Sequence, residues 1–251
     1  MTPRRAFATA GVLALLILLA ACGGDDGPAG DRQTLTVLAA ASLTDVYEDL
    51  GETFEEEHGV EVEFSFGSST DLAVQAADGA PGDVLSTADE TSMQIAEDAG
   101  VAGEVVTFAT NVLVIVTPPE NPAGVTSLDD LTGATWVRCA DEVPCGRVAL
   151  AVLEANAITA EPASLEEDVR ATLDKVTSGE AEAGLVYASD AVAAGDDVAT
   201  SEIPGSEEQR TSYLSAPLEG AEDADLAHAW LDLLASGPGQ QALTDAGFSP
   251  P

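Results

Sequence analysis

Small polar residues stand at several places where the sequence predicts a helix to begin after a strand. Ser42 begins an S-x-x-D pattern that ends at Asp45 and is typical of a helix N-cap. Three further predicted helix starts carry Ser68-Ser69, Cys145-Gly146 and Asp168-Val169. The first turn of a helix has N–H groups without intrahelical partners and about half a positive charge, a combination that binds anions. Any one of these residues alone is best explained as an ordinary cap, whereas the set indicates an anion site.

Strand and helix patterns alternate along the chain and explain how these helix starts could meet. The apolar run Leu35–Ala39 is typical of a buried parallel strand, and apolar residues at helical spacing follow it from Leu43 to Phe54. Later strand patterns cover residues 60–66, 84–85, 111–117, 135–138 and 184–187, and residues 224–235 predict a final amphipathic helix. In an open α/β sheet, helix N-termini that follow strands gather at the carboxyl edge, where ligands bind. The alternation predicts an α/β protein with two lobes on mostly parallel sheets.

Residues 1–21 have the pattern of a secretory signal peptide. Arg4 and Arg5 supply the basic start, and Gly11–Ala21 is a continuous apolar run. The uncharged stretch 6–21 is shorter than the ~20 residues of a transmembrane helix, which disfavours the alternative of a short membrane anchor helix.

The end of this segment, Leu19-Ala20-Ala21-Cys22, resembles a lipoprotein lipobox, in which the cysteine thiol is acylated and the cysteine becomes the new N-terminus. Residues 22–33 are rich in Gly and Asp and suit a flexible tether. We therefore expect the mature protein at the outer face of the cytoplasmic membrane, held there by lipid on Cys22.

The acid–base balance excludes some classes of partner. The chain has 251 residues, with 45 Asp and Glu against 8 Lys and Arg, and a formal net charge of −37. Because phosphate neutralisation needs many Lys and Arg, no nucleic-acid partner is expected. A hydrophobic fraction of 45% is too high for a disordered acidic chain.

Patterns for catalysis, metals and cofactors are missing from the sequence. It contains neither G-x-x-x-x-G-K-[ST] nor G-x-S-x-G. His58 and His228 lie on separate predicted helices, whereas zinc sites usually need three or four ligands. Cys139 and Cys145 lack the C-x-x-C spacing of redox and zinc sites, and outside the cytoplasm they predict a structural disulfide. We expect no enzyme and no cofactor; an extracytoplasmic hydrolase is the less favoured alternative.

Six segments recur in this order in one family. They are Leu35–Asp45 (LTVLAAASLTD), Ser65–Thr70 (SFGSST), Pro81–Val84 (PGDV), Val143–Gly146 (VPCG), Glu167–Arg170 (EDVR) and Gly184–Ala191 (GLVYASDA). On these segments the chain resembles the molybdate-binding proteins of ABC uptake systems, from about Thr34 to Phe248. The resemblance implies the two-lobe periplasmic binding protein fold of type II, which has a hinge and closes over one tetrahedral oxyanion.

The resemblance also implies the residues of the site. The oxyanion would bind the hydroxyls and main-chain N–H groups of Ser42 and Ser69, the N–H groups of Cys145 and Val169, and the hydroxyl of Tyr187. The protein would make no direct bond to the molybdenum. Two departures from the family stand out: Cys145 replaces a common Ala, and Leu214 replaces the Pro that often follows the tyrosine at the returning crossover.

The same resemblance implies the organisation and partners of the protein. The first lobe would comprise residues 34–109 and 216–251, and the second lobe residues 110–215. We expect a monomer that delivers molybdate, and also tungstate, to an ABC permease. Since no Lys or Arg is among the five site residues, neutral donors in a dry cleft would hold the anion. Selectivity over sulfate would come from cavity size, and over phosphate from the absence of an acceptor for its proton.

Two alternatives keep the fold and change the ligand. Ferric-ion binders of this fold use paired tyrosines, so Tyr187 and Tyr213 could be iron ligands. Another oxyanion is the second alternative.

Overall fold

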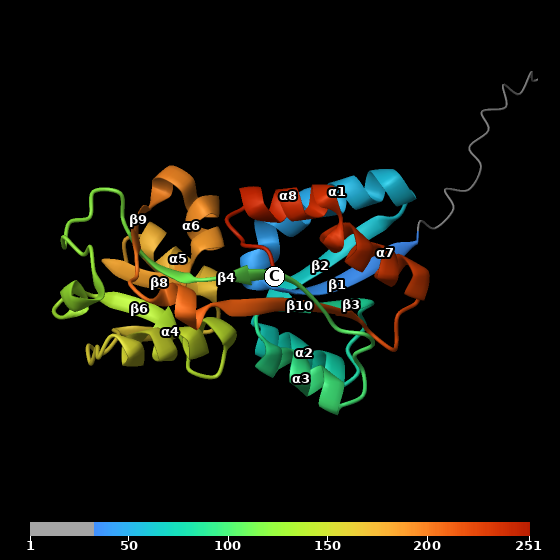
Figure 1. Ribbon diagram of the computed structural model, residues 1–251, viewed down its shortest axis with the longest axis horizontal. Helices are drawn as coiled ribbons and strands as arrows, with labels where there is room; N and C mark the ends of the chain where they lie inside the picture. The colour runs from blue at the N-terminus through green and yellow to red at the C-terminus, as the bar shows by residue number, and fades with distance from the viewer. Residues whose placement is uncertain (1–32) are drawn as a thin grey trace, which may run out of the picture. The chain divides into compact units, whose positions relative to one another are not determined.

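The computed structural model describes residues 33–251, which form two five-stranded sheets flanked by helices (Figure 1). The predicted signal peptide, Cys22 and all but the last residue of the predicted tether lie outside the described residues. No helix within 33–251 combines the length and the apolar character that crossing a membrane requires.

The first sheet has the strand order β2-β1-β3-β10-β4. Its strands are β1 (Thr34–Ala40), β2 (Glu61–Gly67), β3 (Val84–Thr87), β4 (Val106–Asn111) and β10 (Thr211–Pro217). Its helices are η1 (Ala41–Leu43), α1 (Thr44–His58), α2 (Ser69–Ala77), α3 (Glu90–Asp98), α7 (Ala224–Ala235) and α8 (Gly237–Asp245). Figure 1 shows α1, α7 and α8 over one face of this sheet and α2 and α3 over the other. We call this part the first lobe.

The second sheet has the strand order β7-β6-β8-β5-β9. Its strands are β5 (Leu113–Thr117), β6 (Trp136–Cys139), β7 (Ser164–Glu166), β8 (Ala183–Tyr187) and β9 (Ala199–Glu202). Its helices are α4 (Pro144–Ala155), α5 (Val169–Thr177) and α6 (Ala188–Ala194), with short 3₁₀ turns at η2 (Leu128–Leu131), η3 (Gly195–Asp197) and η4 (Ser206–Gln209). We call this part the second lobe.

Four of the five strands in each sheet run in the same direction. In the first sheet only β10 runs opposite to the other four strands, and in the second sheet only β5 does. These are the two strands by which the chain enters one sheet from the other. The predicted two-lobe α/β fold on mostly parallel sheets is thus confirmed.

The lobe boundaries differ slightly from the expected ones. Because β4 extends to Asn111, the chain leaves the first sheet two residues later than the expected boundary of 109. Residues 211–215, which we expected in the second lobe, belong to β10 and pair with β3 and β4 of the first sheet. At Tyr213-Leu214, where the family often has Tyr-Pro, the register with β4 shifts in a β-bulge.

An aromatic cluster forms the core between the first sheet and the helices α1 and α7. Trp230 of α7 packs edge-on against Tyr47 and Phe54 of α1, with ring centroids 5.2 and 5.4 Å apart. The ring of Phe64 of β2 lies 5.7 Å from that of Trp230. His58 stacks on Phe54 at the end of α1, with ring centroids 4.2 Å apart.

Cys139 and Cys145 form a disulfide, as expected from the sequence. Cys139 ends β6 and Cys145 is the second residue of α4, so the bond ties the start of this helix to the strand before it. Both cysteines are buried.

One carboxylate of the second lobe is completely buried. Asp190 of α6 accepts a hydrogen bond from the N–H of Tyr187 (3.2 Å), and its other oxygen lies 3.7 Å from Nε of Arg170. Burial raises the pKa of Asp190 from its ordinary value of 3.8 to about 7, and the charge of Arg170 opposes this rise only in part.

We expect removal of the disulfide to lower the stability of the fold. Closing so small a loop stabilises a protein by about 2 kcal/mol in the chain-entropy model. Urea unfolding of the Cys139→Ala/Cys145→Ala variant should therefore show a loss of this size. In a Cys22→Ser background, the unfolded and unreduced chain should contain no free thiol, and finding two would contradict the bond.

The burial of Asp190 predicts a pH dependence of stability. Below about pH 4 the carboxyl is protonated in both the folded and the unfolded chain. Between pH 4 and 7 it ionises only in the unfolded chain, so the free energy of unfolding falls as the pH rises. Asp190→Asn keeps an acceptor for Tyr187 and cannot ionise. The unfolding free energy of the variant minus that of the parent should rise by up to about 4 kcal/mol across this window and level off above pH 7. A difference that is constant with pH would refute the assignment.

Candidate functional site

All five residues predicted to bind the ligand line one small cavity between the lobes. Ser42 and Ser69 come from the first lobe, and Cys145, Val169 and Tyr187 from the second. Tyr187 ends a strand, and each of the other four lies at the start of the helix or 3₁₀ turn that follows a strand. The cavity volume is about 20 Å³, against roughly 300–1,000 Å³ for sites of organic ligands. The cavity therefore suits a small ion and not a sugar or an amino acid.

The two serines of the first lobe are positioned by hydrogen bonds within that lobe. The pattern predicted Ser42 as the N-cap of α1, and this prediction was wrong. Ser42 lies in η1, and Leu43 is the N-cap of α1. The S-x-x-D pattern failed because the 3₁₀ turn turns the Ser42 hydroxyl towards Tyr213 (2.7 Å). The Ser69 hydroxyl accepts from the N–H of Ala88 (3.0 Å).

These contacts leave both serine hydroxyls able to donate. The Ser69 oxygen is the acceptor of its bond, so its own hydrogen remains available. Burial raises the pKa of Tyr213 well above 10, so Tyr213 stays protonated and can donate to Ser42. The hydrogen of Ser42 is then available as well.

The second lobe presents two main-chain donors at helix starts. Val169 is the first residue of α5 and Cys145 the second residue of α4, so neither N–H has an intrahelical acceptor. Asp168 caps α5 by accepting from Ala171 N–H (2.9 Å). Gly146 allows α4 to begin close to the preceding loop, since a Cβ there would lie 1.7 Å from the carbonyl oxygen of Ala140.

Tyr187 contributes a buried hydroxyl. The residue ends β8 and is 1% exposed, and its Oη has no hydrogen-bond partner among the described residues. Burial raises the pKa of Tyr187 well above 10, so the group is a neutral phenol. A neutral phenol without a partner is a donor ready for an anion.

No Lys or Arg of residues 33–251 lines this cavity, but one acidic residue, Asp168, does. Asp168 belongs to the lining, which contradicts the expectation that the site would border no proton acceptor. Its oxygen Oδ1 accepts a hydrogen bond at the N-terminus of α5, where the helix dipole favours negative charge. The position of an N-cap carboxylate in the cavity wall could not be judged from spacing alone.

Two arginines that the sequence analysis gave no role cross between the lobes beside the cavity. Arg147 binds Asp89 (Nε to Oδ2, 2.7 Å), and Arg170 binds Asp45 and the carbonyl oxygen of Ala41 (3.4 Å). Arg170 follows Val169 directly, and Arg147 follows Cys145 by two residues. The chain has only 8 Lys and Arg, and two of them stand beside expected ligand residues in the sequence. This rarity could have indicated a role for both arginines near the site.

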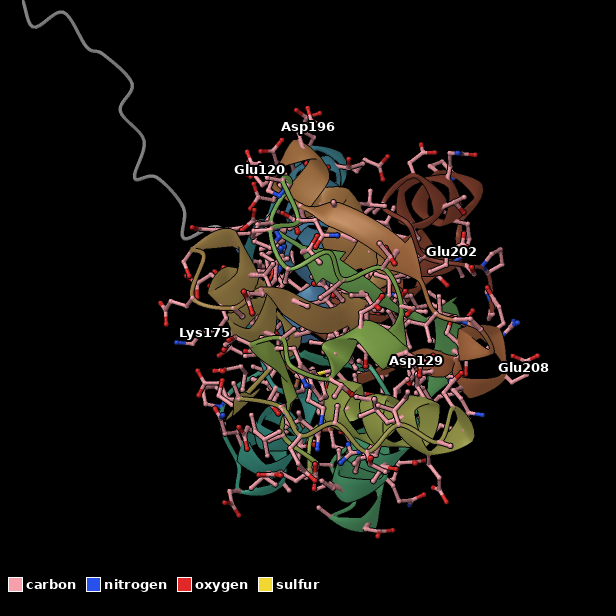
Figure 2. The ribbon with its side chains drawn as sticks, turned by 90° about the vertical axis from the view of Figure 1, so that its left-hand side faces the viewer. Glu120, Asp129, Lys175, Asp196, Glu202 and Glu208 are labelled. Carbon is pink, nitrogen blue, oxygen red and sulfur yellow. A yellow bond between two sulfur atoms is a disulfide. The ribbon has the colours of Figure 1, made fainter. Side chains whose placement is uncertain are left out.

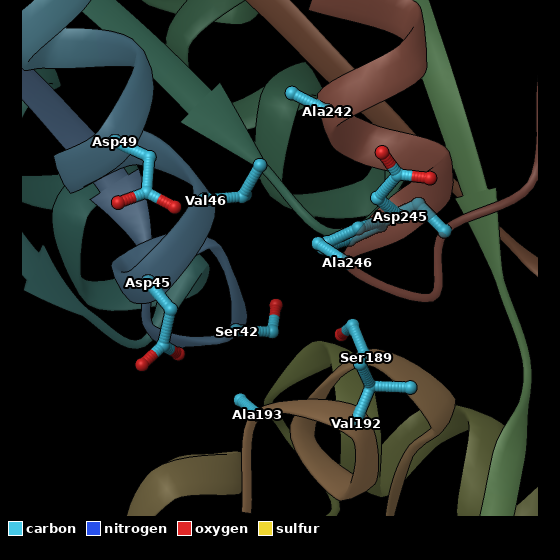
Figure 3. Close-up of a pocket in the computed structure, with 11 residues that line it drawn as sticks. Ser42, Asp45, Val46, Asp49, Ser189, Val192, Ala193, Ala242, Asp245 and Ala246 are labelled. Carbon is cyan, nitrogen blue, oxygen red and sulfur yellow. The ribbon is translucent and has the colours of Figure 1, made fainter.

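Many acidic side chains lie on the surface. Figure 2 shows side chains on the outside of the second lobe, among them Glu120, Asp129, Lys175, Asp196, Glu202 and Glu208. A larger pocket of about 410 Å³, which Ser42 also lines, lies between α1, α6 and α8 (Figure 3). Asp45, Asp49 and Asp245 line it. Arg170 pairs with Asp45, but the carboxylates of Asp49 and Asp245 still repel an anion, so this pocket does not fit the predicted ligand.

The geometry gives little support to an iron site. The rings of Tyr187 and Tyr213 lie 6.0 Å apart, but burial disfavours the phenolate forms that Fe(III) would bind. Within residues 33–251 no group of three or more His, Cys, Asp or Glu could hold a metal ion.

Comparison with known proteins agrees with this architecture. The family model of the bacterial extracellular solute-binding proteins matches residues 35–249. The chain is 36% identical to the molybdate-binding protein ModA of Mycobacterium tuberculosis over 251 residues, 96% of each chain. It is 32% identical to the molybdate-binding protein ModA of Escherichia coli, over 87% of this chain and 90% of that one.

Among solved structures, the periplasmic molybdate-binding protein of Azotobacter vinelandii has the same fold. Its TM-score is 0.78 with 21% sequence identity, over 86% of this chain and 99% of that one. The chain thus belongs to the bacterial extracellular solute-binding proteins, the family of binding components to which its sequence pointed.

Proposed function

We propose that the protein captures molybdate, and also tungstate, between its lobes and delivers it to an ABC permease as a lipid-anchored monomer. The observation that carries this proposal is the cavity itself. Neutral donors from both lobes converge on a space too small for an organic ligand, and the hydroxyl of Tyr187 is buried there with no partner in the described part of the chain. The relatives described as molybdate-binding proteins support the choice of ligand.

The donors suit a tetrahedral dianion. Main-chain N–H groups of Cys145 and Val169 approach from the second lobe, and the hydroxyls of Ser42 and Ser69 from the first. In a dry cavity each such hydrogen bond is stronger than in water, and fixed donors need no reorganisation when the anion arrives. Because donors come from both lobes, binding favours the closed arrangement, in which Arg147 and Arg170 also reach their partners.

The test of this function is calorimetry with molybdate, tungstate, sulfate and phosphate. The parent should bind the first two more tightly than the last two. Tyr187→Phe removes one hydrogen bond to a charged ligand and should weaken molybdate binding by about 1–3 kcal/mol, roughly 5- to 150-fold.

Tyr47→Phe is the matched control for this substitution. Its hydroxyl is also buried, but it donates to Ser86 (2.9 Å) in the core of the first lobe, outside the cavity. This variant should bind molybdate like the parent. If Tyr187→Phe also binds like the parent, the site is assigned wrongly; a coloured complex with Fe(III) would favour the iron alternative.

Anchoring through Cys22 has its own test. In a bacterium that processes lipoproteins, the parent should fractionate with membranes, whereas Cys22→Ser should lose the lipid attachment and its acyl label. Equal membrane retention and equal labelling of both proteins with a fatty acid probe would contradict the lipid anchor and would not affect the proposed binding function.

A further inference from the structure

Ser68 is a buried hydroxyl that the predicted ligand set does not include. It lies one residue before Ser69, is 7% exposed and lines the same cavity as the five predicted residues. Its Oγ is buried and has no hydrogen-bond partner within the described part of the chain. An unpaired buried hydroxyl destabilises a fold, so its position calls for a partner.

The position of Ser68 in the fold makes the missing partner unusual. Ser68 is the N-cap of α2, where a serine oxygen normally accepts from an N–H of the first turn. Here no such bond is formed. At the start of α8, by contrast, Ser236 makes this bond with Gly239 N–H (3.1 Å). The Ser68 hydroxyl therefore leaves its helix uncapped and remains available at the cavity.

We propose that Ser68 donates a further hydrogen bond to the bound oxyanion and favours molybdate over sulfate. The proposal rests on the proposed function of the site. The N–H and hydroxyl of Ser69 reach the anion from the same turn of chain, so Ser68 extends this group of donors along the cavity wall. A larger tetrahedral anion spans more of that wall than a smaller one and gains more from the additional donor.

The decisive variants are Ser68→Ala and Ser68→Gly. Both delete the hydroxyl, and Gly also keeps a favourable N-cap residue, so a folding effect of the cap is separated from an effect of the donor. Calorimetry should give a molybdate dissociation constant roughly tenfold weaker for both variants, with a smaller change for sulfate. The unfolding midpoint without ligand should be unchanged or raised, because no cap bond is lost.

Ser236→Ala is the control, since that serine does cap its helix. It should lower the unfolding midpoint and leave molybdate affinity unchanged. If the parent binds molybdate and both Ser68 variants bind it equally well, Ser68 is not a ligand and the proposed function stands. The proposal is also overturned if Ser68→Ala lowers midpoint and affinity together while Ser68→Gly preserves both. A parent that does not bind molybdate overturns the function and the role of Ser68 together.

Discussion

The structure holds several buried hydrogen-bond donors at one cavity without pairing them to other protein groups, and the rest of the fold serves this requirement. Folding normally pairs such groups, because an unpaired donor away from water costs free energy. Among residues 33–251 the hydroxyls of Tyr187 and Ser68 find no partner and lie at one cavity, beside the first-turn N–H groups of α4 and α5. Since helix geometry itself prevents those N–H groups from pairing internally, the arrangement needs no strained backbone. An oxyanion is the chemical complement of such a cavity.

The strand directions in the two sheets bring these donors together. In each lobe, the strands that precede the donor-bearing turns run parallel, so their carboxyl ends lie at one edge. The chain crosses between the lobes through β4–β5 and β9–β10, and each entering strand is antiparallel to its new sheet. The edges of both sheets thereby border a common cavity while covalent connections between the lobes remain few. That connectivity permits the lobes to separate and close.

Most of the negative charge lies away from the cavity; the exception is Asp168, which lines it and caps α5. The chain carries a net charge of −37, but exposed carboxylates act through water and are screened within about 10 Å at 0.1 M salt. Neutral donors act at contact. The arginines nearest the cavity, Arg147 and Arg170, are bound to carboxylates of the opposite lobe, so they join the lobes and do not line the cavity.

The sequence by itself determined the alternation of strands and helices, most of the helix starts, the pairing of Cys139 with Cys145 and five of the residues that line the cavity. Periodicity and cap chemistry act over a few residues, and ordered motifs carry the family pattern, so both can be read along the chain. Tertiary structure alone decided where β10 pairs, that Ser42 turns towards Tyr213, that Ser68 leaves its helix uncapped, and that Arg170 meets Asp45. Each of these depends on contact between segments far apart in the sequence. Whether a hydroxyl or a carboxylate finds a partner is set by the three-dimensional neighbours that burial brings to it.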